Sequence, residues 1–433
     1  MEPVPAYTRT FTLQSSLSVD AVQDRLSVSD SYPRITYYFL RILVTYSTRG
    51  KWQAPGKHRV LCPTMRSIMP TPKLPDIHLL LPFALPSAAD AASALHKLDR
   101  PALDRLLARA TLNERVIGDD FQRTLPNERW IARQFGAVSE APGQAADEAP
   151  LAPYMLLADG GTPGDTVWAC VEPVHVRIAR DHLVLIDPAT LGMDDEEGRT
   201  LFDVVKPLIE DLGLTIQAPR PARWYVAGPN LGTLAGASPL RASGRNIEIW
   251  LPHEAGTGER SRAWMKLQNE VQMAWFEHPL NEAREARGLP AINSIWLHAQ
   301  GTLRSVTSPF AQVMSNAPAT RGLALAANIT PQAPPESFAA FMASTMTSDG
   351  RALVELDPFS APFIEQDWAR WNDALGTLER DWFAPALAAL ENGTLGTLRL
   401  TLCSDTGSVS LTVTRRALRK FWRRRPIAAL LIE

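Results

Sequence analysis

The stretch that decides the fold is EVQMAWFEHPLNEAREARGLPAINSIWLHAQG, residues 270–301. It runs from an apolar, helix-like segment through a His-Pro-x-Asn-x-x-Arg core into an apolar strand. The core is dense in polar residues that an ordinary hydrophobic interior would not select. His278, Asn281, Arg284 and Asn293 are therefore candidate ligand-binding residues.

The same residues also fit a purely structural role, which the pattern favours. His278, Asn281 and Arg284 would cap and join the end of a helix, with Pro279 at the first position of the next helix. Asn293 begins a strand, where its side chain would satisfy backbone groups of the neighbouring turn.

The composition is typical of a soluble globular protein. Of the 433 residues, 45% are apolar and 21% are charged, and the length allows two to three domains. A net charge of −2 provides no general attraction to nucleic acid or to a membrane. Cys62, Cys170 and Cys403 are too far apart in sequence to indicate a disulfide framework or a Cys-x-x-Cys metal site. We therefore expect a cytoplasmic protein without a membrane partner.

The N-terminal segment differs from the rest of the chain. Residues 1–64 are rich in Ser, Thr, Tyr and Arg and have no sustained helix or strand period. An apolar run at residues 35–46 is too short to span a membrane. Because Met65 and Met69 directly precede the first regular segment, we expect residues 1–73 to be an extension that is disordered or not translated.

From residue 76 the hydrophobic pattern becomes regular. It predicts strands at residues 77–85, 155–159, 166–178, 182–187, 223–228, 246–252, 293–299, 351–356, 397–403 and 408–414. It predicts helices at residues 87–98, 100–110, 125–136, 194–213, 264–277, 365–391 and 415–425. Strands that alternate with helices favour an α/β protein with a mixed sheet.

A resemblance to a known family rests on the quoted stretch. Its HPLN-x-x-R-x-x-x-G-L-P-A-I-N pattern is similar to the HPVN segment of archaeal-type, cofactor-independent phosphoglycerate mutases. The chain also resembles the RpfE-type regulatory proteins of proteobacteria, which are divergent relatives of those mutases. That second resemblance rests on the NERW helix, the EPVH strand and the FWRR near the C-terminus.

The resemblance implies an alkaline-phosphatase-like fold, a mixed sheet flanked by helices with an inserted α+β cap domain. Residues 74–150 would begin the phosphatase-like domain, residues 151–301 would form the cap, and residues 302–433 would complete the first domain and end in a basic helix. Phosphoryl transfer on this fold requires two divalent metals and a metal-activated serine.

The residues that should bind those metals are missing from the matching positions. The first strand continues into Pro82 and Phe83 where the family has Asp-Gly, and Asp357 has no histidine near it. The strand that should end in Asp-His ends in Cys403-Ser404-Asp405, and all eight histidines lie at or before His298. We therefore expect no catalytic residues, no metal ligands and no cofactor.

Two further features are candidates for binding. Arg223 could hold an anion with two hydrogen bonds, although a salt bridge is the simpler role. The basic run near the C-terminus could bind an acidic partner or nucleic acid, although a solvated helix face is the simpler interpretation. The candidates in this run are Arg415, Arg419, Arg423, Arg424 and Arg425.

Three functions remain open. The favoured one is a non-catalytic regulatory or interaction protein that binds an unknown protein or a small anionic ligand. The alternatives are a metal-dependent phosphoglycerate mutase or phosphotransferase with relocated ligands, and a protein that binds nucleic acid or an acidic partner through the basic C-terminal segment.

Overall fold

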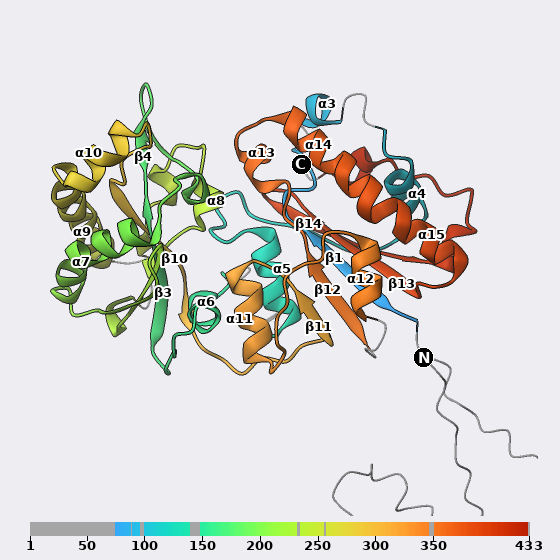
Figure 1. Ribbon diagram of the computed structural model, residues 1–433, viewed down its shortest axis with the longest axis horizontal. Helices are drawn as coiled ribbons and strands as arrows, with labels where there is room; N and C mark the ends of the chain where they lie inside the picture. The colour runs from blue at the N-terminus through green and yellow to red at the C-terminus, as the bar shows by residue number, and fades with distance from the viewer. Residues whose placement is uncertain are drawn as a thin grey trace, which may run out of the picture. The chain divides into compact units, whose positions relative to one another are not determined.

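A six-stranded mixed sheet draws its strands from both ends of the described chain (Figure 1). The computed structural model describes residues 74–87, 89–95, 99–138, 148–231, 234–254, 257–345 and 350–431, all within the unit of residues 71–433. The predictions for residues 1–73 and for most of the linker at 141–150 lie outside these ranges.

The strand order of this sheet is β11-β12-β1-β13-β14-β2. The strands are β1 (Asp76–Leu81), β2 (Thr111–Ile117), β11 (Gln312–Met314), β12 (Arg351–Glu355), β13 (Thr397–Cys403) and β14 (Gly407–Thr414). The first four in spatial order are parallel, and β14 and β2 run antiparallel to their neighbours. The central strand β1 is buried along nearly its whole length because helices cover both faces of the sheet.

Alternate residues of β1 belong to two hydrophobic cores. Ile77, Leu79 and Leu81 pack with one layer of helices, and Leu80 packs with the other. The first layer contains α4 (Pro101–Arg109), α12 (Phe338–Thr345), α14 (Trp368–Leu378), the π-helical turn η4 (Glu379–Phe383) and α15 (Ala384–Asn392). The second layer contains α5 (Pro126–Gln134), α6 (Ala152–Ala158) and α11 (Pro318–Ala326).

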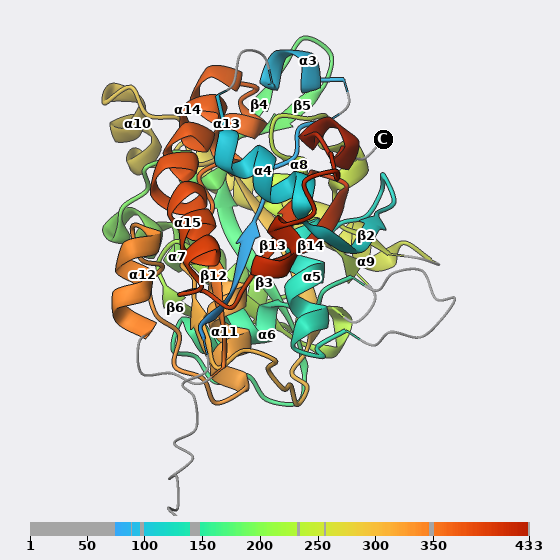
Figure 2. The same cartoon turned by 90° about the vertical axis from the view of Figure 1, so that its right-hand side faces the viewer.

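Helices from opposite ends of the described chain meet in the first layer. Helix α4 lies beside α15, and Arg105 forms an ion pair with Glu391 between them (Figure 2). The carboxylate of Glu379 accepts hydrogen bonds from the backbone N–H groups of Ala102 and Leu103, at 2.6 and 3.0 Å. This carboxylate satisfies donors that the first turn of α4 would otherwise leave unpaired.

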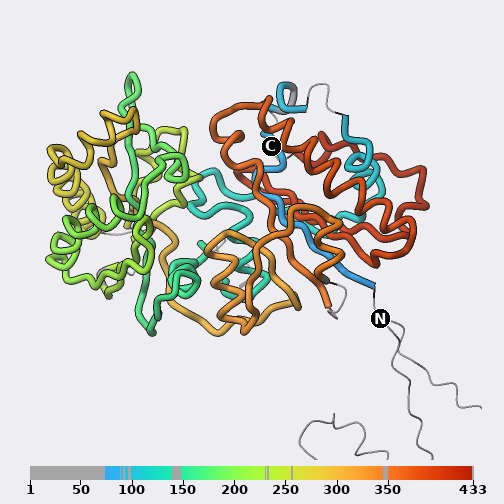
Figure 3. The backbone as a smooth tube through the Cα atoms, in the orientation of Figure 1, coloured from blue at the N-terminus to red at the C-terminus, as the bar shows by residue number. Residues whose placement is uncertain are grey.

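The chain between β2 and β11, coloured mostly green to yellow in Figure 3, forms a second, four-stranded antiparallel sheet. Its strand order is β10-β3-β7-β6. The strands are β3 (Val167–Val174), β6 (Thr215–Arg220), β7 (Arg223–Ala227) and β10 (Ser294–Thr302). Helices α7 (Asp195–Glu210) and α9 (Glu259–Phe276) pack on one face, and α10 (Pro279–Ala286) follows α9. The opposite face carries Cys170, Tyr225 and His298 and packs with α6.

Smaller elements complete the described chain. They are the strand pairs β4 (Val176–Ile178) with β5 (Leu183–Leu185) and β8 (Leu234–Ala235) with β9 (His253–Glu254), the helices α3 (Ala91–Ala94), α8 (Pro239–Ala242), α13 (Ser360–Ile364) and α16 (Arg415–Leu418), and the 3-10 turns η1 (Pro188–Thr190), η2 (Pro229–Leu231), η3 (Glu248–Trp250) and η5 (Ile427–Leu430). Within the described ranges, no helix is both long and apolar enough to cross a membrane.

Most predicted elements are confirmed, and two strands were wrong. Residues 155–159 belong mainly to helix α6, because Pro153 starts a helix and an apolar run this short has no diagnostic period. Residues 246–252 contain the turn η3, because the Asn246 side chain accepts a hydrogen bond from the backbone N–H of Glu248 at 3.0 Å.

Three other predictions were too long. The first strand ends at Leu81, since Pro82 follows and Phe83 adopts a positive φ of 52°. Within the predicted 87–98 helix, residues 91–94 are helical among the described residues, and residues 88 and 96–98 lie outside the described ranges.

The predicted basic helix at 415–425 stops at Leu418. The backbone carbonyl of Arg423 accepts a hydrogen bond from Arg109, and the Arg425 side chain donates to the carbonyl of Ala110. These contacts hold the last arginines against the end of α4 in a non-helical conformation.

Candidate functional site

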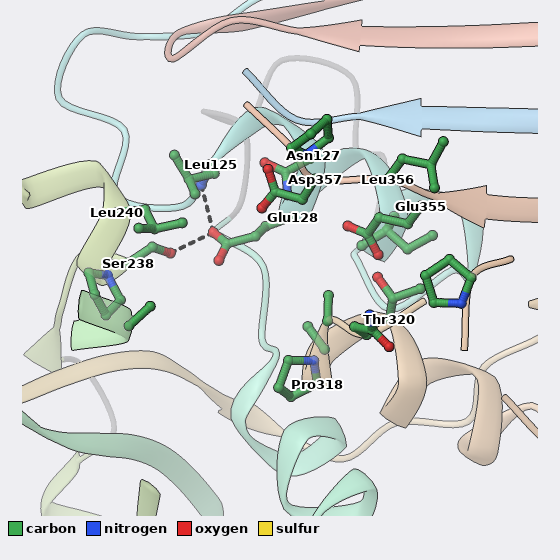
Figure 4. Close-up of a pocket in the computed structure, with 18 of the residues that line it drawn as sticks. Leu125, Asn127, Glu128, Ser238, Leu240, Pro318, Thr320, Glu355, Leu356 and Asp357 are labelled. Atoms are coloured by element: carbon green, nitrogen blue, oxygen red, sulfur yellow. Dashed lines mark hydrogen bonds between the residues drawn. The ribbon is translucent and has the colours of Figure 1, made fainter. Parts of the chain in front are cut away.

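A cavity of about 700 Å³ lies where β12 ends (Figure 4). Residues of both sheets line it. Glu355 and Asp357 come from the end of β12, Glu128 from the first turn of α5 and Thr320 from the first turn of α11. In α/β proteins, ligands bind at the carboxyl ends of the parallel strands, so this position is the expected one for a binding site.

The wall of the cavity is strongly acidic. Its carboxylate-bearing residues are Glu128, Glu172, Asp187, Glu336, Glu355, Asp357 and Asp381. The basic side chains that line it are Arg223 and His298. The guanidinium of Arg223 already donates to both carboxylate oxygens of Asp159, at 2.8 Å each. The cavity therefore presents more acidic than basic groups to whatever enters it.

Local structure fixes two of these carboxylates. Glu128 occupies the third position of α5, where it accepts a hydrogen bond from the backbone N–H of Leu125 at 2.7 Å and another from the hydroxyl of Ser238 (Figure 4). Glu355 accepts a hydrogen bond from the hydroxyl of Ser315 at 2.6 Å and one from Thr320. Burial raises the pKa of both carboxyls, and these hydrogen bonds only partly oppose it.

Two further carboxyls in the cavity behave in the same way. Burial raises the pKa of Asp357, although the backbone N–H and hydroxyl of Ser360 donate to it. Burial also raises the pKa of Asp187, and the neighbouring carboxylates Glu172 and Asp357 add to that effect. A raised pKa means that the surrounding protein does not fully offset the cost of burying the ionised carboxylate. A bound cation would therefore stabilise the ionised forms of these carboxyls.

Metal-binding geometry occurs at one place in the described part of the chain. Cys170, Glu172 and His298 offer ligand atoms that all lie within 4.8 Å of one another. Asp357 belongs to no such group among the described residues. Asp405 lies outside the cavity and forms an ion pair with Arg245 at 2.7 Å. The two aspartates that follow the strands expected to bind metal therefore do not line one cavity.

The polar residues of the quoted stretch lie elsewhere, around α10. The ring of His278 accepts a hydrogen bond from the backbone N–H of Leu280, at the N-terminus of the helix. Asn281 is 4% exposed; its amide donates to the carbonyls of Trp275 and Ile292 and its oxygen accepts from the N–H of Ile292. These bonds join the end of α9 to the chain that leads into β10.

Arg284 and Asn293 make similar internal connections. The fully buried guanidinium of Arg284 pairs with Glu197 and donates to the carbonyls of Leu191 and Pro290. The amide of Asn293 exchanges two hydrogen bonds with the backbone of Val176. Of the predicted ligand-binding residues, Arg223 lines the cavity and the others do not.

The predicted partner-binding arginines lie in and after α16. Arg423, Arg424 and Arg425 gather around a hollow beside the end of α4 and the start of β2. Arg415 and Arg419 are exposed at and just beyond α16.

Sequence reasoning missed most of the residues that line the cavity. Glu172 interrupts the apolar strand β3, and Glu355 ends the apolar strand β12. Glu128 follows Leu125 at the spacing of a capping box. A charged residue inside or at the end of an apolar strand was the available signal, because such a position is costly without a function or a partner.

Comparisons with known proteins give a limited result. No family model and no curated protein match this chain. Among solved structures, the PH0037 protein from Pyrococcus horikoshii is similar, with 13% identity and a TM-score of 0.44 over 79% of this chain and 88% of that one. The cofactor-independent phosphoglycerate mutase from Thermoplasma acidophilum DSM 1728 has 13% identity and a TM-score of 0.37 over 83% of this chain and 95% of that one. At this level of similarity, function has to be judged from the chemistry of the cavity.

Proposed function

We propose that this chain is a regulatory, ligand-binding protein that does not transfer phosphoryl groups, and that its cavity binds a small ligand with positive charge. The observation that carries this proposal is the composition of the wall: seven carboxylate-bearing residues line the cavity with Arg223 and His298, and Arg380 pairs with one of the seven, Asp381. A regulatory role agrees with the sequence resemblance to RpfE-type proteins.

The proposal departs from the expectation of a small anionic ligand. An anion in the cavity would meet Glu128, Glu355 and Asp357, and Arg223 is already committed to Asp159. Like charges at short range repel more strongly in a protein cavity than in bulk water. A protonated amine would instead donate hydrogen bonds to these carboxylates and lower their raised pKa values.

The alternative of a metal-dependent phosphotransferase places different demands on the same cavity. Two metal ions about 4 Å apart would have to bind at the end of the parallel strands and leave room for a phosphate. Asp357 instead accepts hydrogen bonds from Ser360, and Glu355 accepts from Ser315. These contacts favour a binding site over an alkaline-phosphatase-like centre, with the second sheet as its cover.

The first test is ligand binding by the full chain, measured by calorimetry at low salt. We expect the linear diamine putrescine to bind and inorganic phosphate to give no heat of binding. We also expect Glu355→Gln to weaken putrescine binding by about 10-fold, since one charge-assisted hydrogen bond contributes about 1.5 kcal/mol. The matched control is Glu285→Gln, which changes an exposed glutamate on α10 outside the cavity.

Two outcomes would contradict the proposal. One is tighter binding of phosphate than of putrescine. The other is turnover of 3-phosphoglycerate or a phosphate monoester by the chain supplied with Mn²⁺ or Zn²⁺, if Asp357→Asn abolishes that turnover.

A further inference from the structure

Three side chains with metal-binding chemistry share one face of the second sheet. Cys170 on β3 and His298 on β10 are directly opposite in the antiparallel register, and Glu172 lies two residues beyond Cys170. Side chains two residues apart on a strand, and those directly opposite on a neighbouring strand, point to the same side. The sheet backbone therefore positions all three ligands without help from a loop.

The distances are close to those of a zinc site. His298 Nε2 lies 3.4 Å from Glu172 Oε1, and Cys170 Sγ lies 4.0 Å from the same oxygen. Around a tetrahedral zinc ion, bonds of about 2.0 Å to nitrogen and oxygen and about 2.3 Å to sulfur separate ligand atoms by roughly 3.3–3.5 Å. The nitrogen–oxygen pair already has this spacing, so only the sulfur has to move closer.

The buried ring of His298 has Glu172 as its ion-pair partner. His298 is 3% exposed, and neither ring nitrogen makes a hydrogen bond. Its Nε2 lies 3.4 Å from Glu172 Oε1, which is within the distance of an ion pair but long for a hydrogen bond. An imidazole that is buried and unsatisfied is destabilising unless it has another role, and coordination of a metal is such a role.

We propose that Cys170, Glu172 and His298 bind one divalent transition-metal ion, and that zinc fits this set of sulfur, oxygen and nitrogen donors best. Glu172 and His298 line the cavity, so a fourth coordination position faces it. Three protein ligands with one open position are the arrangement in which zinc can also contact a ligand or a water molecule. As the metal–sulfur bond forms, the thiol of Cys170 releases its proton to solvent.

The charge around the site is compatible with a cation. Arg223 is the nearby positive group, and Asp159 and the hydroxyl of Tyr225 already bind it. The Cys170 thiolate and the Glu172 carboxylate would offset the two charges of the metal. The metal site shares Glu172 and His298 with the cavity wall, whereas Glu128, Glu355 and Asp357, to which an amine would bind, take no part in it.

The test uses the full chain, freed of metal by a chelator and then titrated with Co²⁺. We expect saturation at about one equivalent, with the absorption band that a sulfur–cobalt bond produces. Cys170→Ser should abolish that band and weaken Co²⁺ binding by more than about 100-fold, and Glu172→Gln should weaken binding with the band retained at saturation. The circular dichroism of each variant is compared with that of the unchanged chain, and Glu172→Gln decides the test if Cys170→Ser does not fold.

Cys403→Ser and Cys62→Ser are the matched controls. Cys403 is equally buried but lies on β13, outside the three-residue group. Both controls should retain the band and the affinity. The proposal is overturned if the unchanged chain produces no sulfur–cobalt band, if the band survives Cys170→Ser, or if either control removes it. An ordinary His298–Glu172 ion pair beside a buried thiol would then describe this face of the sheet.

Discussion

Replacement of Arg284 by alanine is expected to lower the free energy of unfolding by about 3–5 kcal/mol, because it breaks a buried ion pair. The guanidinium is fully buried and contacts Glu197 and the carbonyls of Leu191 and Pro290. Without it, two carbonyls lose a donor, and Glu197, whose side chain is 8% exposed, loses its buried partner. Urea unfolding followed by tryptophan fluorescence at neutral pH measures the effect.

The matched control is Arg287→Ala. Arg287 pairs with the same carboxylate, but its side chain is 53% exposed, so its loss should change the free energy of unfolding by less than about 1 kcal/mol. If Arg284→Ala were as mild as the control, Arg284 would not be needed for folding. A role for Arg284 in binding a ligand would then have to explain why the residue is buried.

The sequence alone does not show whether the polar residues of the 270–301 stretch bind a ligand or other parts of the chain. A pattern of His, Asn and Arg looks the same whether the side chains bind a ligand or the backbone. Which of the two roles these side chains have depends on whether the groups that they contact belong to a ligand or to the chain. Arg284 contacts Leu191 and Glu197, which are far away in sequence. No local pattern contains that information.

The sheets show where hydrophobic pattern is sufficient and where it is not. Strands β1, β12 and β13 are buried and were predictable as short apolar runs bounded by turn residues. Strand β2, TLNERVI, is exposed along most of its length and was missed. It pairs with β14 at the edge of the sheet, so its backbone forms the ladder while its side chains need no apolar face.

The cavity was still less accessible from sequence. Glu128, Glu172 and Glu355 come from three segments and two sheets, and only the topology brings them together. In the sequence, each of these three glutamates stands out as a charged residue beside apolar ones, but nothing in the sequence shows that they lie together. Arg223 was the predicted binding residue that does line the cavity, and Asp159 neutralises it.

The second large effect is expected from pH and depends on His78, at the centre of the six-stranded sheet. Its ring lies 4.7 Å from Trp130 and hydrogen-bonds Thr401 at 2.8 Å. Burial, with Arg351 and Arg399 on the two neighbouring strands, lowers the pKa of His78 from 6.5 to about 3. Asp76 lies between those arginines at 3.6 and 3.4 Å and offsets their charge only in part.

The direction in which stability changes with pH depends on whether the folded or the unfolded chain binds the proton. The folded chain keeps His78 neutral, whereas the unfolded chain protonates it below its ordinary pKa, so stability is complete above about pH 6.5 and declines as the pH falls toward 3. At pH 4 the loss amounts to about 3 kcal/mol, at 1.36 kcal/mol per pKa unit.

Carboxylates also contribute to acid unfolding, so the measurement compares two slopes. These are the slopes of unfolding free energy against pH for the unchanged chain and for His78→Gln, from urea unfolding at several pH values. The glutamine variant should lose stability less steeply, by about one proton, because it has nothing to titrate at that position. His253→Gln, which changes an exposed histidine on β9, should leave the slope unchanged. Equal slopes for the unchanged chain and His78→Gln would mean that the sheet accommodates a charged His78, and the acid sensitivity would then have to come from the buried carboxyls of the cavity.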